Sequence, residues 1–187
     1  MAEMMMYDSS MLLWVDETGC DGRKLVHDHG YVIRGIPSRD HTLKLSGKRY
    51  SVTAAMSKDG VEDIYIQEGI VNGAIFLDFI CRCLIPVLMP FNGHNPISTV
   101  IMDNASVHKG GRVQELTNGV GALLRFSPAY SPDLNPIEEV FAEVKGYLKA
   151  NGVFKATSSP QTLINLAFSS VPKDNCVSYI HHSGYSY

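Results

Sequence analysis

The chain has 187 residues, enough for one domain with a sizeable core and few for two. Its hydrophobic content of 45% and charged content of 19% are ordinary for a globular protein. The formal charge of −3 argues against a domain that holds DNA by bulk electrostatics, because that affinity comes from Lys and Arg neutralising phosphates.

Cysteine spacing and hydropathy exclude two further classes. The four cysteines form no Cys-x-x-Cys pair and no signal peptide precedes them, so we expect no disulfides, no zinc knuckle and no secretion. Charged residues and prolines interrupt the apolar run at 74–91. This run therefore predicts a buried helix and no membrane span.

The first half of the chain reads as strands followed by a long helix. Apolar and β-branched runs predict strands at 11–16, 30–34, 49–56 and 61–66, then a helix at about 73–88. Strands at 97–102 and 122–126 follow, with a short helix at 112–116 between them and helices from 136 and at 157–171. A meander, a helix and then alternating strands and helices predict an α/β fold, with a mixed sheet covered on both faces.

The helix that starts near Pro136 has strong local signals. Asn135 suits the N-cap, Pro136 the first helical position, and Glu138 the capping-box position three residues after the cap. Capping alone would explain Glu138. The helix should bury one face and place Glu138 on its flank, whereas Glu139 should point nearly opposite; the buried residues are Ile137, Val140, Phe141, Val144 and Leu148.

Three acids follow or flank these elements. Asp16 and Asp103 each end a predicted strand, and Glu138 follows Asp103 after 34 intervening residues. Sites in open α/β sheets lie at the carboxyl ends of strands. Magnesium prefers oxygen ligands, so two Asp and one Glu can form a divalent-metal cage without His or Cys.

These residues stand in motifs that resemble the transposases of the mariner superfamily. The matching fragments are Trp14-Val15-Asp16-Glu17, Asp103-Asn104-Ala105-Ser106-Val107-His108 and Ser131-Pro132-Asp133-Leu134-Asn135-Pro136-Ile137-Glu138. The resemblance implies the Asp-Asp-Glu catalytic domain, a ribonuclease-H-like fold with a five-stranded mixed sheet. It also implies DNA strand cleavage and transfer with two Mg²⁺ or Mn²⁺ ions, for which Asp16 and Asp103 are direct ligands and Glu138 completes the ligand shell of the second ion.

Auxiliary residues follow from the same resemblance and from charge. His108 could position a phosphate or the attacking water, and Asn104 could orient the Asp103 loop; a hydrogen-bonded loop histidine and a simple turn residue are the alternatives. A basic cluster could contact DNA phosphates, or could be a solvated hairpin. Its members are Lys44, Lys48 and Arg49.

The resemblance also predicts organisation and partners. We expect a single catalytic domain over residues 1–187, with a core at about 8–155, a helical tail at about 156–187 and no N-terminal helix-turn-helix domain. Its partners would be transposon ends and target DNA, a homodimer is allowed, and the location would be nuclear in a eukaryote and otherwise cytoplasmic. An alternative is a lapsed or domesticated transposase remnant that acts only as a binding or interaction protein. The presence of all three acids argues against this alternative. A haloacid-dehalogenase-type phosphatase would need an Asp where Thr18 stands.

Overall fold

The fold is built on a five-stranded mixed sheet. A computed structural model of the chain describes residues 7–21, 49–104, 111–128, 131–150 and 159–185. The strand order is β3-β2-β1-β4-β5, and the strands are β1 (Leu12–Asp21), β2 (Arg49–Ser57), β3 (Gly60–Glu68), β4 (Thr99–Met102) and β5 (Leu123–Phe126). The first three form an antiparallel meander, whereas β4 runs parallel to β1 and β5 parallel to β4. The predicted mixed five-stranded α/β sheet is confirmed.

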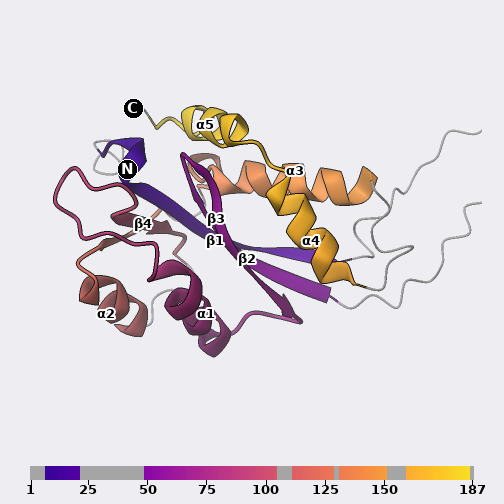
Figure 1. Ribbon diagram of the computed structural model, residues 1–187, viewed down its shortest axis with the longest axis horizontal. Coiled ribbons are helices and arrows are strands. Elements are labelled where there is room, and N and C mark those ends of the chain that lie inside the picture. Colours follow the sequence, from indigo (N-terminus) through magenta and orange to yellow (C-terminus); the bar gives the residue numbers. More distant parts are fainter. Residues whose placement is uncertain (1–6, 22–48, 105–110, 129–130, 151–158, 186–187) are drawn as a thin grey trace, which may run out of the picture.

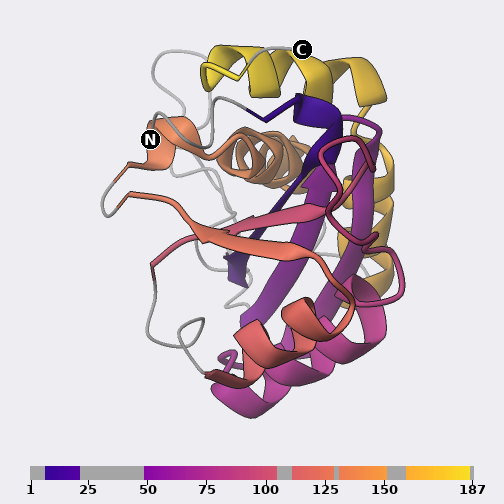
Figure 2. The ribbon, with the colours of Figure 1, turned by 90° about the vertical axis from the view of Figure 1, so that its left-hand side faces the viewer.

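Helices cover both faces of this sheet, as predicted (Figure 1, Figure 2). One face carries α1 (Gly73–Phe79), its π-helical continuation η3 (Ile80–Leu84) and α2 (Gly111–Gly119). The other carries α3 (Ile137–Ala150), α4 (Pro160–Ser169) and α5 (Lys173–His182). The 3-10 turns η2 (Ser9–Met11) and η4 (Pro132–Leu134) come just before β1 and α3. Within the described ranges no helix is long and apolar enough to cross a bilayer.

Alternation along β1 divides its side chains between two cores. Leu12 and Trp14 belong to the buried cluster beneath α3, α4 and α5, whereas Leu13 and Val15 belong to the cluster beneath α1 and α2. The predicted buried face of α3 is confirmed, because all five of its apolar residues are buried in the first cluster. The central strand and α3 are therefore fixed against each other by packing.

Two predicted boundaries were wrong. The first strand does not end at Asp16, because its next five residues also pair with β2 and β1 continues to Asp21. The helix predicted over 73–88 ends at Leu84. Pro86 has no N–H with which to continue the helical hydrogen bonds, and Val87 closes a turn on Leu84.

The remaining differences concern the C-terminal helices and one predicted strand. The tail helix predicted at 157–171 is α4, and a further helix, α5, follows it. This helix lies within the helical tail expected at about 156–187, but its own bounds were not predicted, because only Cys176 and Ile180 of α5 are buried and so short an apolar stripe does not mark them. The strand predicted at 30–34 lies outside the described residues.

Candidate active site

The register of two parallel strands sets Asp16 beside Asp103. Val15 pairs with Met102, the last residue of β4, so Asp16 and Asp103 are the next residues along the two strands. Neighbouring strands are about 4.8 Å apart. Trp14 and Ile101, two residues earlier, both pack beneath α3, and the same alternation extended to Asp16 and Asp103 assigns both to the α3 side of the sheet.

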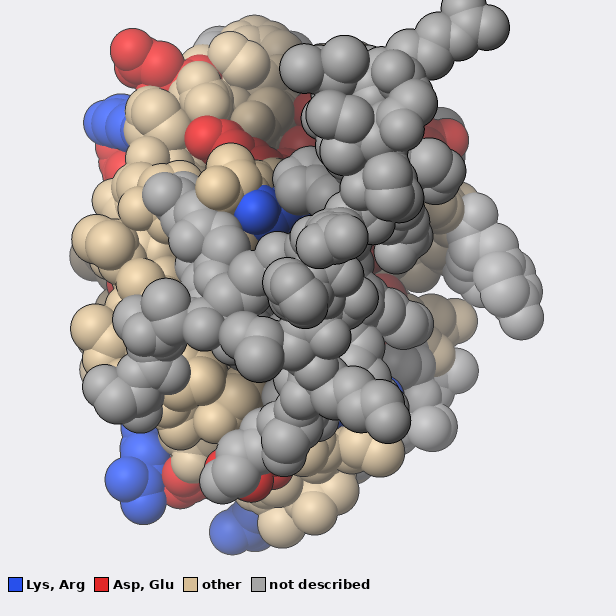
Figure 3. Space-filling model, turned by 90° about the vertical axis from the view of Figure 1, so that its right-hand side faces the viewer, with Lys and Arg blue, Asp and Glu red and all other residues tan. Residues whose placement is uncertain are grey.

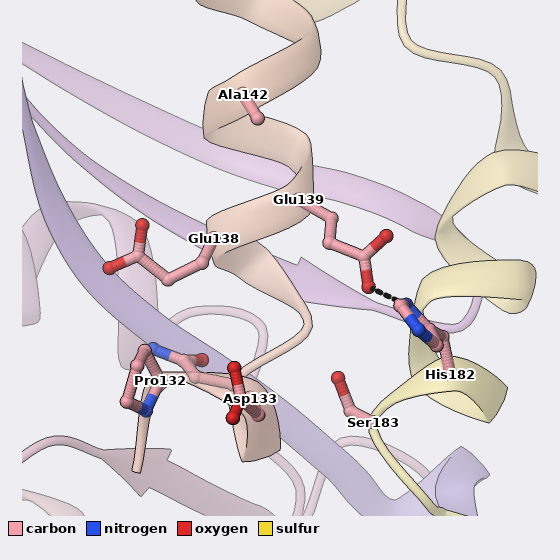
Figure 4. A pocket seen from close by; sticks show the side chains of 8 residues that line it. Pro132, Asp133, Glu138, Glu139, Ala142, His182 and Ser183 are labelled. Atoms are coloured by element: carbon pink, nitrogen blue, oxygen red, sulfur yellow. Dashed lines mark hydrogen bonds and ion pairs between the residues drawn. The ribbon is translucent and has the colours of Figure 1, made fainter. Parts of the chain in front are cut away.

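The third acid, Glu138, stands in the first turn of α3. Its side chain and that of Glu139 leave the helix in opposite directions (Figure 4). Glu139 points to the end of α5, where its Oε1 lies 2.7 Å from His182 Nδ1. Glu138 is exposed and makes no side-chain hydrogen bond within the described part of the chain. Glu138 is therefore the one of the two that is free to turn toward Asp16.

The Asp16 carboxyl is buried and strongly perturbed. It is 9% exposed, accepts the Glu17 N–H at 2.7 Å on Oδ1, and accepts Asn135 Nδ2 at 2.6 Å on Oδ2. The pKa of Asp16 is raised from its ordinary 3.8 to about 7. Burial is the largest cause, the charges of Glu138, Glu17 and Asp103 add to it, and the hydrogen bond from the Glu17 N–H opposes it. Among the described residues, no Lys or Arg contributes to the pKa of Asp16. A cation beside this carboxylate would favour its charged form.

The donor set suits a hard divalent cation. Three carboxylates supply the oxygen ligands that Mg²⁺ and Mn²⁺ take in proteins. As the side chains stand, no group of three or more His, Cys, Asp or Glu among the described residues is arranged to hold a metal ion. Carboxylates without a cation repel one another, so closure of the acids around an ion would require the ion itself. The three acids match a divalent cation in the type and charge of their donor atoms, but their side chains in this structure are not arranged as a set of metal ligands.

Asn135 has a different role from the predicted one. Its side chain was expected to cap α3, but α3 begins at Ile137 and the Asn135 amide donates to Asp16. The backbone carbonyl of Asn135 accepts the Glu138 N–H at 3.1 Å. Asn135 therefore connects Asp16 to the first turn of the helix that carries Glu138. The sequence did not predict this contact with Asp16, because the residue type and position of Asn135 are also typical of an N-cap.

A pocket of about 390 Å³ opens beside this turn. Asn135 is among its lining residues. Glu138 lines it together with residues of η4 and the end of α5 (Figure 4). Its other lining residues are Pro132, Asp133, Glu139, Ala142, His182 and Ser183. The pocket gives solvent and ligands access to the Glu138 side of the site.

The remaining predicted residues are only partly described. Asn104 is exposed just after β4, whereas His108, Lys44 and Lys48 lie outside the described residues. Arg49 opens β2, is exposed and pairs in register with Asp21. Its guanidinium lies beside Gly19, three residues beyond Asp16 along β1. On the face shown in Figure 3, the Lys and Arg side chains of the described residues stand apart rather than in one patch.

Comparison with known proteins identifies the class of this domain. Residues 11–159 match the family described as DDE superfamily endonuclease. The chain therefore belongs to the DDE superfamily endonuclease family, as the motifs predicted. No curated protein is a significant match to the chain.

Solved structures with the same fold include those of the Mos1 mariner transposase. The Mos1 mariner paired end complex with Mn has 19% identity and a TM-score of 0.66, over 92% of this chain and 52% of that one. The Mos1 paired-end complex with left transposon end gives 19% identity and 0.65 over the same shares, and the Mos1 catalytic domain gives 17% and 0.62 over 92% and 76%. The predicted ribonuclease-H-like fold is confirmed. The chain spans about half the length of the transposase chains in the paired-end complexes.

Proposed function

We propose that this chain is the catalytic domain of a metal-dependent DNA endonuclease that cleaves and transfers strands, with Asp16, Asp103 and Glu138 as its acids. The observation that carries the proposal is the buried Asp16 carboxylate, whose pKa rises to about 7 by burial and by the charges of Glu138 and Asp103. Membership of the DDE endonuclease family supports the same assignment.

The three acids have distinct roles in this proposal. Asp16, Asp103 and Glu138 would together hold the Mg²⁺ or Mn²⁺ ions, with Asp16 and Asp103 as direct ligands and Glu138 completing the ligand set. When bound, the ions stabilise the attacking and leaving oxygens of the phosphodiester. Asp16 is held ready by the Glu17 N–H and Asn135, so its carboxylate loses little freedom when a ligand binds.

The reaction proposed is substitution at a DNA phosphodiester. In cleavage, a water oxygen gives up a proton and bonds to phosphorus, the bond to the departing strand oxygen breaks, and that oxygen takes up a proton. In transfer, a strand 3′-hydroxyl oxygen replaces the water. Transposon ends and target DNA are the proposed substrates, supported by the Mos1 paired-end complex with left transposon end.

Residues away from the acids would place the duplex. Arg49 is exposed, and its guanidinium lies beside Gly19, three residues beyond Asp16 along β1. It would contact a DNA phosphate, and such contacts fix register rather than sequence. His108, Asn104, Lys44 and Lys48 remain proposed auxiliary residues, the first and the last two from the sequence alone.

A nicking assay tests the proposal with a matched pair of variants. Supercoiled plasmid with Mn²⁺ should be nicked by the wild type and by Glu139→Gln, but at least about 100-fold more slowly by Glu138→Gln and Asp103→Asn. Glu139 is the control because it occupies the same helical turn and points away from Glu138. Equal activity in all four proteins would refute the assignment. Salt-sensitive DNA binding without any nicking would favour the lapsed remnant that only binds.

A further inference from the structure

A turn from a distant part of the chain holds the Asp16 carboxylate. Asn135 Nδ2 donates to Asp16 Oδ2 over 2.6 Å. Asn135 also closes η4, because its N–H donates to the Pro132 carbonyl at 2.9 Å. The orientation of Asp16 therefore depends on the position of this turn.

Tyr185 attaches the same turn to β1. Its hydroxyl donates to the carbonyl of Leu134, the residue before Asn135, at 3.0 Å. Its ring meets Trp14 edge-on, with centroids 5.1 Å apart and planes at 75°. Trp14 precedes Asp16 by two residues on the same face of β1, and Tyr185 is only 3% exposed. One buried side chain thus contacts both segments that meet at Asp16.

The end of α5 delivers Tyr185 to this position. Gly184 has φ +86, in the left-handed region that glycine adopts without a steric cost. This residue lets the chain turn back, and the Tyr185 N–H donates to the Ile180 carbonyl at 3.2 Å. His182 adds a contact to Glu139 in the first turn of α3 (Figure 4).

We propose that Asn135 and Tyr185 are positioning residues for the acidic site, a role that rests on the proposed function. Asn135 orients the Asp16 carboxylate, and Tyr185 fixes the turn that carries Asn135. Partners that hydrogen-bond to a metal ligand typically change metal affinity by about 10- to 100-fold. The C-terminal segment after α5 is thereby a part of the metal-binding apparatus.

Tyr179 supplies a matched control for Tyr185. It lies on α5, and its hydroxyl donates to Glu143 Oε2 of α3 at 2.7 Å. Glu143 is more than a helical turn beyond Glu138 on α3. Tyr179→Phe and Tyr185→Phe therefore each remove one hydroxyl that joins the C-terminal segment to the region of α3, but only Tyr185→Phe removes it from the turn that holds Asp16.

Two measurements separate positioning from general stability. Calorimetric titration with Mn²⁺ alone should show the dissociation constant raised by about tenfold in Asn135→Ala, and by roughly fivefold, the equivalent of one hydrogen bond, in Tyr185→Phe. Tyr179→Phe should leave it within twofold. Hydrogen exchange should be faster at the Leu134 and Asn135 amides in Tyr185→Phe and unchanged there in Tyr179→Phe.

Each outcome decides the proposal. If Tyr185→Phe and Tyr179→Phe lower the melting temperature alike and neither changes Mn²⁺ affinity or exchange at Leu134 and Asn135, Tyr185 has only a structural role and the proposal fails. If the wild type binds no Mn²⁺, the proposed function fails. In that case the exchange comparison still decides whether Tyr185 fixes the turn: faster exchange in Tyr185→Phe alone supports the coupling, and equal exchange overturns it.

Discussion

Replacement of Asp16 by Asn should stabilise the metal-free protein at alkaline pH while removing its proposed function. The variant keeps the size of the side chain, and the new amide oxygen can still accept the Glu17 N–H that Asp16 accepts at 2.7 Å. The new NH₂ group would meet the Asn135 amide nitrogen, now 2.6 Å from Asp16 Oδ2. Asn135 can turn its amide over and accept instead of donating, so both hydrogen bonds can survive.

The expected gain follows from the pKa of Asp16. A folded-state pKa near 7 against an ordinary 3.8 means that the folded protein binds the proton more tightly than the unfolded chain. At ~1.36 kcal/mol per pKa unit, the cost of ionising Asp16 in the folded state reaches about 4 kcal/mol. Below about pH 4, Asp16 therefore does not lower the free energy of unfolding. The loss of stability from its ionisation grows as the pH rises from about 4 to about 7 and stays constant above that. The Asp16→Asn variant avoids this cost, because its amide does not ionise.

Urea unfolding in EDTA at pH 4.5, 6 and 8 measures this difference, with the fluorescence of the single, buried Trp14 as the signal. The advantage of Asp16→Asn should increase from about 1 kcal/mol or less at pH 4.5 to between about 2 and 4 kcal/mol at pH 8. Asp133→Asn is the control, because it removes an exposed charge near the same turn and should change stability by less than about 0.5 kcal/mol at every pH. An advantage that is absent at pH 8, or equal at all three pH values, would refute the desolvation of Asp16.

Other perturbations give separate tests. Mn²⁺ at 100 times its dissociation constant should stabilise the wild type by about 2.7 kcal/mol. For a domain of this size, that is a rise of about 5–10 °C in melting temperature. Asp103→Asn should abolish the rise, and a rise of equal size in this variant would contradict the metal site. Phe141→Ala should lower the free energy of unfolding in urea by about 3–5 kcal/mol. Phe141 is 1% exposed, and the centroid of its ring lies 6.2 Å from that of Phe168. A decrease below about 1 kcal/mol would contradict this packing. Binding to DNA should weaken steeply between 50 and 200 mM salt without sequence preference, as judged by fluorescence anisotropy with transposon-end and scrambled duplexes; salt-resistant discrimination between them would contradict it.

Sequence patterns predicted the parts of the fold that depend on local physics. The apolar run before Asp16 marked the central strand, and the spacing of apolar residues marked the buried face of α3. The continuation of β1 to Asp21 escaped prediction because Gly19 and polar neighbours break the pattern there. Pairing with β2 holds this part of the strand extended, and the paired residues are between 28 (Asp21 with Arg49) and 36 (Glu17 with Thr53) positions apart in the chain.

The candidate site shows the same division. Asp16, Asp103 and Glu138 were recognised from motifs, yet local signals explained Glu138 equally well as a capping residue. The relation between the acids depends on the register of β1 with β4, which no local pattern contains. Asn135 was assigned to a cap because its residue type and position fit one, whereas a carboxylate 119 residues earlier in the chain accepts its amide.

The chain order of the strands has a consequence for synthesis. Leu12 of β1 pairs in parallel with Thr99 of β4, whereas β2 and β3 are complete by Glu68. At about 5–20 residues per second, β1 waits between about 4 and 17 s for its second neighbour. During that time the middle strand of the finished sheet is an open edge, and its Trp14 face lacks the cover of α3. Nascent or truncated chains that end before Thr99 should therefore associate through this edge, and chaperones that recognise exposed strands should bind them.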